Sequence, residues 1–255
     1  MSGTGRRVAM ITGASRGLGL ALARSLGSAG WSLVIDARGA GPLERARAEL
    51  ASRTTVRAIA GDVADESHRR RLVEEAGRLG GLDLLVNNAS LLGPSPQPNL
   101  ERYPLDVLDE VYRANVFAPL RLVQLALPLL RSSRGRVINV TSDAGVVAYE
   151  GWGGYGSSKA ALEHLSGVLA VELPDLRVYW IDPGDMNTQM QQEAFPGEDV
   201  SDRPSPEASV PGFLRLIEGE LPSGRYLARD LSAATGPVEA LRREVTTEAA
   251  TEGAR

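Results

Sequence analysis

The chain has 255 residues, of which 43% are hydrophobic and 24% charged, and this balance suits a single globular domain with a large core. Its net charge of -4 argues against a surface for nucleic acid or anionic membranes, and the absence of cysteine excludes disulfides and thiolate chemistry. The two histidines, His68 and His164, show no metal-ligand spacing, so we expect solvated or interface side chains and no bound metal. No run reaches transmembrane length, and a strand starting at Val8 leaves no room for a signal peptide, so we expect a cytoplasmic protein.

Predicted strands and helices alternate along the chain, which indicates a parallel sheet covered by helices on both faces. The strand candidates are Val8–Ile11, Ser32–Ile35, Thr55–Ala60, Leu82–Asn87, Arg136–Thr141, Arg177–Asp182 and Gly224–Ala228. The helix candidates are Gly17–Ala29, Leu43–Arg53, Asp65–Leu79, Leu105–Leu130, Tyr155–Val171 and Ala208–Glu218. Pro119 and Pro128 lie inside the fourth helix, where either can kink it and Pro128 can begin its end. We see no internal repeat or linker, so we expect one α/β domain over residues 1–230, a doubly wound sheet of about seven strands, and a flexible tail over 231–255.

A glycine-rich turn follows the first strand, with the sequence Thr12-Gly13-Ala14-Ser15-Arg16-Gly17-Leu18-Gly19, and leads into a helical pattern. Strand, glycine-rich turn and helix is the context that dinucleotide binding requires. The glycines let the backbone approach a pyrophosphate, and the helix N-terminus offers free N–H groups. The spacing is G-x-x-x-G-x-G rather than G-x-G-x-x-G, and the alternative interpretation is an ordinary β–α turn.

A tyrosine and a lysine lie four residues apart at the start of a later helix, as Tyr155-Gly156-Ser157-Ser158-Lys159. Residues at this spacing share one helix face, so the ammonium should favour the phenolate and lower the pKa of Tyr155. A phenol beside a fixed cation can act as a general acid or base. The pattern is weak alone and gains weight from the glycine-rich turn.

Taken together, these motifs resemble the short-chain dehydrogenase/reductase family of the single-domain, Rossmann-like type, from about Arg7 to about Ala228. Further pieces fall in the family's order and spacing: Asp62-Val63, Asn87-Asn88-Ala89, Asn115, Ser142, and Pro183-Gly184 with Thr188. One position departs from the pattern, because Ser90 stands where the family usually has glycine. That serine puts cofactor affinity slightly in doubt, and its side chain is expected to point into the substrate cleft.

The resemblance implies a catalytic set of Asn115, Ser142, Tyr155 and Lys159. Tyr155 would exchange a proton with the substrate oxygen, and Lys159 would lower its pKa and bind the nicotinamide ribose. Ser142 would polarise the carbonyl, and Asn115 would hold a water for proton relay. The implied cofactor-binding residues are Gly13, Ser15, Arg16, Gly17, Leu18, Gly19, Arg38, Asp62, Val63, Asn88, Ala89, Tyr155, Lys159, Pro183, Gly184, Met186 and Thr188. Taken singly, Asp62 could instead cap the helix that starts near Asp65, Asn115 could be a buried amide that hydrogen-bonds backbone, and Ser142 could cap a turn.

The residues Asp36-Ala37-Arg38, at the end of the second strand, lie where the choice between NADP and NAD is made. The family's discriminating acid falls at Ala37, and its phosphate-binding arginine matches Arg38. Arg16 can reach the same phosphate, so the two cations favour NADP(H). The rival is Asp36 binding a ribose hydroxyl of NAD, although neighbouring side chains in a strand point opposite ways.

The substrate is expected to be a small ketone, aldehyde or alcohol. Candidate pocket residues are Leu91, Leu92, Val147, Tyr149, Trp152, Met186, Met190 and Phe195, which suit an apolar or aromatic compound. A lid is expected over about residues 186–212, and its part Glu193–Glu207 carries five acids against one arginine. The favoured function is an NADP(H)-dependent carbonyl reductase; the alternatives are an NAD-dependent alcohol dehydrogenase, a non-catalytic nucleotide sensor, and a non-redox isomerase or lyase. The family also implies a homodimer or homotetramer, in which Leu120, Leu122, Val123 and Leu127 would serve a helix bundle or merely pack on the sheet.

Overall fold

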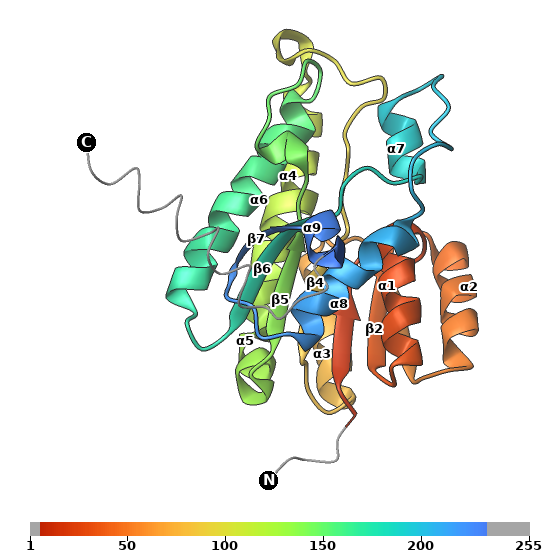
Figure 1. Cartoon of the computed structure of the whole chain (residues 1–255), viewed down its shortest axis with the longest axis vertical. Helices are drawn as coiled ribbons and strands as arrows, with labels where there is room; N and C mark the ends of the chain where they lie inside the picture. The colour runs from red at the N-terminus through yellow and green to blue at the C-terminus, as the bar shows by residue number, and fades with distance from the viewer. Residues whose placement is uncertain (1–5, 234–255) are drawn as a thin grey trace.

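The computed structural model describes residues 6–233 as a parallel β-sheet with helices on both faces (Figure 1). The sheet in this part of the chain has seven strands in the order β3-β2-β1-β4-β5-β6-β7, each parallel to its neighbours. The strands are β1 (Val8–Ile11), β2 (Ser32–Ala37), β3 (Val56–Ala60), β4 (Leu84–Asn87), β5 (Arg136–Val140), β6 (Arg177–Asp182) and β7 (Gly224–Leu227). This order confirms the doubly wound sheet and puts the reversal of strand order between β1 and β4, where ligands of such sheets bind.

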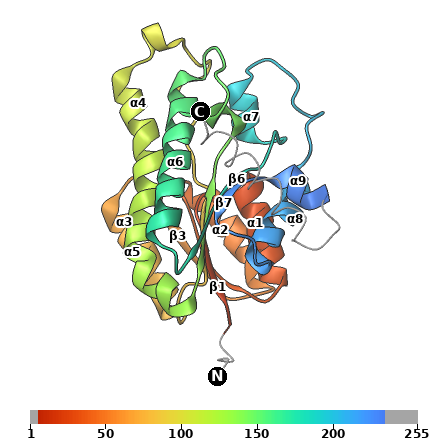
Figure 2. The same ribbon diagram turned by 60° about the vertical axis from the view of Figure 1, so that its left-hand side comes forward.

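The helices form two layers, one on each face of the sheet (Figure 2). One layer contains α1 (Gly17–Ser28), α2 (Ala40–Ala51), α8 (Val210–Glu218) and α9 (Ala228–Ala233). The other contains α3 (Glu66–Arg78), α4 (Leu105–Tyr112), α5 (Ala118–Ser133) and α6 (Gly153–Glu172). The short helix α7 (Gln189–Ala194) lies beyond the carboxyl ends of the strands. No helix within residues 6–233 is both long and apolar enough to cross a membrane.

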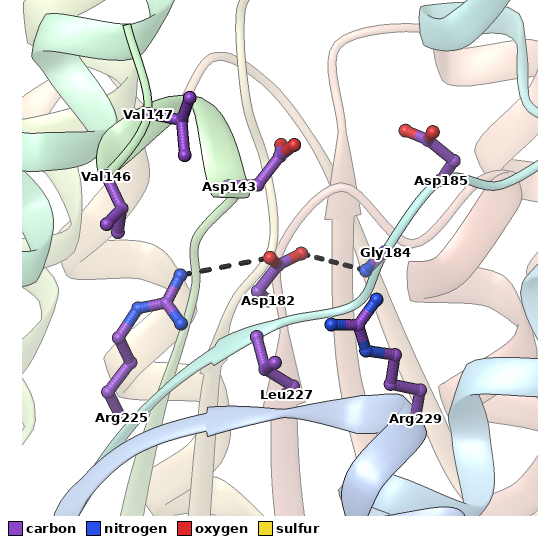
Figure 3. Close-up of a pocket in the computed structure, with 9 residues that line it drawn as sticks. All are labelled: Asp143, Val146, Val147, Asp182, Gly184, Asp185, Arg225, Leu227 and Arg229. Atoms are coloured by element: carbon purple, nitrogen blue, oxygen red, sulfur yellow. Dashed lines mark hydrogen bonds and ion pairs between the residues drawn. The ribbon is translucent and has the colours of Figure 1, made fainter.

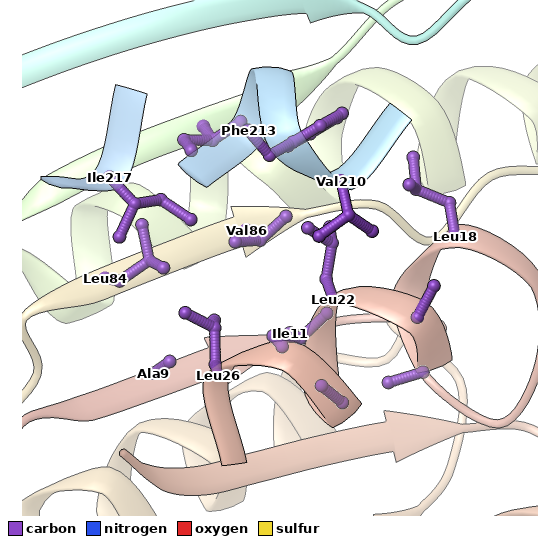
Figure 4. Close-up of a cluster of buried hydrophobic side chains, with 14 of the residues drawn as sticks. Ala9, Ile11, Leu18, Leu22, Leu26, Leu84, Val86, Val210, Phe213 and Ile217 are labelled. Atoms are coloured by element: carbon purple, nitrogen blue, oxygen red, sulfur yellow. The ribbon is translucent and has the colours of Figure 1, made fainter. Parts of the chain in front are cut away.

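Two apolar cores follow from the alternation of side chains along the strands. On β1, Ala9 and Ile11 belong to the core under α1 and α8, where they meet Leu22 and Phe213 (Figure 4). Val8 and Met10 of the same strand belong to the opposite core, under α3 and α5. All four β1 residues are buried, which is why this strand is a continuous apolar run.

The long helix expected over Leu105–Leu130 is divided, and this expectation was wrong. A π-helical turn, η2 (Arg113–Phe117), separates α4 from α5. Pro119 has no N–H to give to the carbonyl of Asn115 four residues earlier, so the α-helical ladder is broken there. The second proline does not begin the end of the helix, because α5 continues past Pro128 to Ser133.

Other boundaries shift by a few residues at most. The start of α2 moves from Leu43 to Ala40, because Pro42 then falls in the first turn, where a missing N–H costs little. The helices α7 and α9 were not predicted. Leu122 and Val123 are buried in the core under α5, so they pack on the sheet and are not free for a helix bundle. Of the expected tail, residues 231–233 end α9 and residues 234–255 lie outside the described part of the chain.

Candidate active site

The glycine-rich turn is closed by contacts with the loop after β4. Gly13 and Gly17 have φ angles of 67° and 55°, which favour glycine. A Cβ on Gly13 would lie 2.9 Å from Ala89 Cα, and one on Gly19 would lie 2.5 Å from Gly13 O. The turn therefore needs glycine at positions 13 and 19 for its own packing, before any ligand is considered.

The N-terminus of α1 is suited to an anion. Its N-cap, Arg16, makes no side-chain capping hydrogen bond, and the first turn contains no acidic residue. Above Gly17 there is open space, since an added Cβ would meet only Thr188 Cγ2, at 3.6 Å. Leu18 is buried in the core, so it can offer a ligand only its backbone, and Ser15 lies half-buried in the turn. Free amides at the positive end of a helix fit a pyrophosphate.

Asn88 and Ala89 support this turn through Thr12. The Thr12 hydroxyl oxygen accepts from the amides of Asn88 and Ala89, both at 3.0 Å. The Asn88 amide group donates in turn to the carbonyls of Thr12 at 2.8 Å and Gly13 at 3.2 Å. Four backbone groups of the turn and the loop after β4 are thus satisfied by one threonine and one asparagine.

Asp36 has a structural role at the end of β2. It is 1% exposed, and its two oxygens accept from the Gly13 amide at 2.8 Å and pair with His68 Nε2 at 2.9 Å. Burial raises the pKa of Asp36, against the lowering effect of its bonds to His68 and Gly13. The carboxylate is therefore enclosed, which speaks against the rival role at an NAD ribose. His68 is 3% exposed, so the expectation of a solvated side chain was wrong for it, whereas His164 is exposed.

Arg38 follows on the open side. It is exposed, and within residues 6–233 it makes no hydrogen bond or ion pair. Arg16 donates to Gln189 at the start of α7. Arg16 is thus the N-cap of α1, and Arg38 directly follows the end of β2.

The loop after β3 holds Asp62 and Val63. Asp62 accepts from the Ala64 amide at 2.8 Å, while Asp65 caps α3 by accepting from the Ser67 amide at 2.9 Å. The alternative in which Asp62 caps that helix was therefore wrong. Arg69 donates to the Val63 carbonyl and holds this loop against α3.

Tyr155 and Lys159 lie on α6 and face the end of β5. Tyr155 is 7% and Lys159 2% exposed, and Lys159 Nζ lies 5.4 Å from the centre of the Tyr155 ring. The Lys159 ammonium donates to the Val140 carbonyl at 2.8 Å. Burial lowers the pKa of Lys159 to about 8, while the charges of Glu163 and Asp182 oppose this shift. Lys159 is also the only lysine in the chain.

The expected lowering of the Tyr155 pKa is wrong for the protein by itself. Burial raises the pKa of Tyr155 above its usual range, and the nearby carboxylates of Asp182 and Asp143 add to the rise. The hydroxyls of Ser90 and Ser142 act in the opposite direction. The net shift is upward because the cost of placing a phenolate in a buried site exceeds the stabilisation that the two serine hydroxyls give to it.

Ser142 follows β5 and lies at the same edge as Tyr155. Its hydroxyl donates to Asp143 Oδ1 at 3.0 Å and accepts from the Ala144 amide at 3.2 Å. The turn-capping alternative is thus present in the structure, together with a position next to the phenol. Sequence reasoning did not single out Asp143, although it directly follows Ser142.

The Asn115 side chain is fully engaged in holding the site together. Its oxygen accepts from the Leu91 amide at 2.7 Å and from the Ser90 hydroxyl at 3.1 Å. Its nitrogen donates to the Leu91 carbonyl at 2.9 Å and to the Ser158 hydroxyl at 3.0 Å. Asn115 therefore ties the loop after β4 to α6, within one helical turn of Tyr155. Pro119 has no N–H to donate to the backbone carbonyl of Asn115.

The segment after β6 supplies the remaining predicted residues. Gly184 has a φ of 75°, and the Pro183 carbonyl accepts from the Ser209 hydroxyl at 2.8 Å. Thr188 caps α7 by accepting from the Gln191 amide at 3.2 Å. Met186 and Thr188 both line the cleft described next.

These elements enclose a cleft of about 90 Å³, which we call the central cleft. Its lining includes Ser142, Tyr155, Pro183, Gly184, Met186 and Thr188, with Leu92, Trp152, Met190 and Ala194 as an apolar wall. Of the other pocket candidates, Phe195 packs on Trp152 at 5.8 Å between ring centres, and Tyr149 donates to Asp143 at 2.9 Å. Leu91 is held by Asn115, and Val147 lines a neighbouring cavity. The acids Asp143, Asp182 and Asp185 also line the cleft, and sequence reasoning missed them.

Known proteins resemble this chain in sequence and in fold. The sequence signature described as short chain dehydrogenase matches residues 7–199. The chain is 37% identical over 229 residues to a rhamnolipids biosynthesis 3-oxoacyl-[acyl-carrier-protein] reductase of Pseudomonas aeruginosa, covering 86% of this chain and 83% of that protein. It is 35% identical over 206 residues to the sepiapterin reductase of Mus musculus, covering 75% and 79%. A short chain dehydrogenase of Shigella flexneri, solved in complex with NADP, superposes with a TM-score of 0.80 at 28% identity, over 88% of this chain and 98% of that one.

Proposed function

Since the chain belongs to the short chain dehydrogenase family, whose members are oxidoreductases acting on C=O and CH–OH groups, we propose that it reduces a ketone or aldehyde with NADPH and uses Tyr155 as the general acid. The observation that carries the proposal is the meeting of Tyr155 and Ser142 in one cleft, with Lys159 behind the phenol. The uncapped N-terminus of α1 opens at the same edge of the sheet.

The chain's own residues fit the dinucleotide. The free amides at the start of α1 would hold the pyrophosphate, and Asp62 and Val63 would flank the adenine. Arg38, exposed and without a partner in the described residues, would bind the 2′-phosphate together with Arg16. The enclosure of Asp36 by Gly13 and His68 supports NADP over NAD. When bound, the nicotinamide supplies the hydride for the carbonyl carbon.

The cleft residues would move the proton. Ser142 would turn its hydroxyl from Asp143 to the substrate oxygen and polarise the carbonyl. The raised pKa of Tyr155 keeps the phenol protonated at neutral pH, as an acid for carbonyl reduction must be. As the proton leaves, the Lys159 ammonium would stabilise the phenolate, and a water on the Asn115 carbonyl would return a proton from solvent.

A tyrosine variant tests the mechanism. In Tyr155→Phe we expect kcat to fall by about 10³-fold or more, because the phenol is the only proton donor proposed for the substrate oxygen. NADPH affinity, measured by fluorescence titration, should stay within about twofold. Tyr226→Phe is the matched control, since Tyr226 donates to the Pro222 carbonyl away from the cleft. Near-normal turnover in Tyr155→Phe would refute the role of Tyr155.

We also propose that the protein assembles as a homo-oligomer. Several large apolar side chains are exposed on the α4–α6 side of the molecule: Leu105, Phe117, Val168 and Val171. These side chains do not overlap the central cleft. Light scattering of the purified protein tests the assembly, and a monomer at micromolar concentration would contradict it.

A further inference from the structure

A buried aspartate–histidine pair lies beneath the loops that would hold the dinucleotide. Asp36 is near the end of β2 and His68 is in the first turn of α3, and they are 1% and 3% exposed. Asp36 Oδ2 and His68 Nε2 are 2.9 Å apart. Val34, two residues earlier, belongs to the core under α3, so the alternation along the strand turns Asp36 toward that helix. Neither side chain has a part in the proton transfer proposed above.

The other oxygen of Asp36 holds the glycine-rich turn. Asp36 Oδ1 accepts from the Gly13 amide at 2.8 Å, and the backbone carbonyl of Asp36 accepts from the Ala14 amide at 2.9 Å. The turn also packs closely on the loop after β4, because a Cβ on Gly13 would lie 2.9 Å from Ala89 Cα. The position of the Asp36 carboxylate therefore sets the position of the first residues of the turn.

His68 also packs against the loop after β3. A Cβ on Gly61 would lie 2.7 Å from His68 Cε1 and closer still to Nδ1, so the imidazole lies directly on the backbone of Gly61. Asp62 and Val63, which would flank the adenine, come next in this loop, and the neighbouring Arg69 donates to the Val63 carbonyl. The start of α3 thus holds this loop in place.

The one polar contact of the His68 ring is with Asp36. His68 Nδ1 is buried and has no hydrogen-bond partner among the described residues. Whichever atom holds the shared proton, the hydrogen bond joins Nε2 to Asp36 Oδ2. Without His68, this buried carboxylate oxygen would lose its partner, which is costly. The carboxylate would then be free to turn, and its hydrogen bond to Gly13 would be disturbed.

We propose that His68 is a positioning residue for the cofactor: through Asp36 it holds the glycine-rich turn and the loop after β3 in the arrangement that binds the adenosine half of NADP(H). The proposal rests on the cofactor site proposed above. His68 is 3% exposed and would touch no ligand itself. It acts on affinity because loops that are already held in place lose less freedom when the ligand binds.

The effect should be confined to the adenosine half, because the pair and the substrate cleft lie at different parts of the sheet. Figure 3 shows the β6–β7 end of this edge, where Arg225 lies 3.8 Å from Asp182 beside a cavity of about 350 Å³. In the strand order, β1, β4 and β5 separate β2 from β6. Ser142 and Tyr155, which would bind the carbonyl, belong to the central cleft, which Asp182 also lines.

A double-mutant cycle tests the proposal, with His68→Leu, Asp36→Ala and the variant that carries both substitutions. Two probes are titrated into each protein: NADPH, and 2′-phospho-ADP-ribose, which lacks the nicotinamide. His68→Leu should weaken the binding of both probes by the same factor, about tenfold or more, because a buried hydrogen bond is lost. The double variant should lose about as much affinity as the weaker single variant, since both substitutions remove one shared interaction.

Two further substitutions separate positioning from the stability of the fold. His68→Gln keeps an N–H donor on a long side chain, so its affinity for both probes should lie within about threefold of wild type. His164→Leu, at an exposed histidine of α6, is the matched control and should leave both affinities unchanged. Circular dichroism establishes that each variant is folded.

Equal affinities of folded His68→Leu and wild type, or losses that multiply in the double variant, would overturn the proposal and leave the cofactor site standing. If wild type binds neither probe, the cofactor site fails, and this proposal fails with it. If His68→Leu does not fold, the imidazole signals of wild type decide, because His68 and His164 are the only histidines in the chain. Addition of 2′-phospho-ADP-ribose should shift the signals of His68 and leave those of His164 in place. Unmoved His68 signals in the ligand-bound protein overturn the proposal.

Discussion

Replacing Lys159 by methionine should stabilise the protein at neutral pH while removing its activity. Lys159 is almost fully buried, and its ammonium makes one hydrogen bond, to the Val140 carbonyl. Burial lowers its pKa from 10.5 to about 8. The folded state therefore binds this proton less tightly than the unfolded state does, and the charged amine costs folding free energy at neutral pH.

The size of the effect follows from the shift. At about 1.36 kcal/mol for each pKa unit, the shift corresponds to about 3 kcal/mol at neutral pH. This cost disappears as the pH rises from about 8 to 10.5, because both states then release the proton. Methionine fills a similar volume without charge, and the lost hydrogen bond costs about 1 kcal/mol. Lys159→Met should thus be about 2 kcal/mol more stable than wild type at neutral pH and slightly less stable at pH 10.5.

Urea unfolding of wild type and Lys159→Met, each at neutral pH and at pH 10.5, measures how the difference in their free energies of unfolding changes with pH. Other groups that titrate at high pH are the same in both proteins, and no second lysine contributes. The pKa can also be read directly, because isotope labelling of lysine gives a single side-chain signal. A stability difference that does not change with pH, or a lysine that titrates near its usual value, would refute the reasoning.

Three further predictions concern other parts of the site. Arg38→Ala should weaken NADPH binding by about tenfold or more and NADH binding by less than about twofold in fluorescence titrations; equal losses would mean that Arg38 does not bind the 2′-phosphate. Ser90→Gly removes a hydroxyl that lowers the pKa of Tyr155, so the apparent pKa for alcohol oxidation should rise, by up to about one unit, in a kcat/KM profile against pH. An unchanged profile would count against any role of Ser90 in the proton step. Gly19→Ala should lower the melting temperature, because the added Cβ would lie 2.5 Å from Gly13 O. Gly77→Ala should raise the melting temperature, because its Cβ would meet nothing within 4 Å. Equal shifts in the two variants would contradict this packing argument.

Much of the fold could be read from the sequence because strand and helix periods are local signals. The run Val8–Ile11 is apolar at every position because β1 faces a core on both sides. The motif residues meet because the parallel strands bring the loops after β3, β4, β5 and β6 to one edge. Asn88 and Ser142 could therefore be placed at the same edge of the sheet before their contacts were known.

What could not be read depends on neighbours that are distant in sequence. Asp36 and His68 are 32 residues apart, and nothing local marks them as a buried pair. The π-helical turn at Asn115 depends in part on Pro119, which the sequence shows. It also depends on the hydrogen bonds of Asn115 with Leu91 and Ser158, which only the structure shows. The pKa of Tyr155 is a sum over burial, two carboxylates and two hydroxyls, so the spacing of Tyr155 and Lys159 alone gave the wrong direction.

The upward shift of the Tyr155 pKa and the downward shift of the Lys159 pKa have one physical cause. Both groups are buried, and burial disfavours the charged form of each. At neutral pH the pair therefore contains a neutral phenol and an ammonium, with a net charge of +1. When the phenol gives its proton to a substrate oxygen, the pair becomes a phenolate beside an ammonium, with no net charge. A buried ion pair is less costly than two isolated buried charges, and the low dielectric strengthens its attraction. The lysine thus favours the phenolate most at the moment when the phenolate forms, which reconciles a high resting pKa with proton transfer.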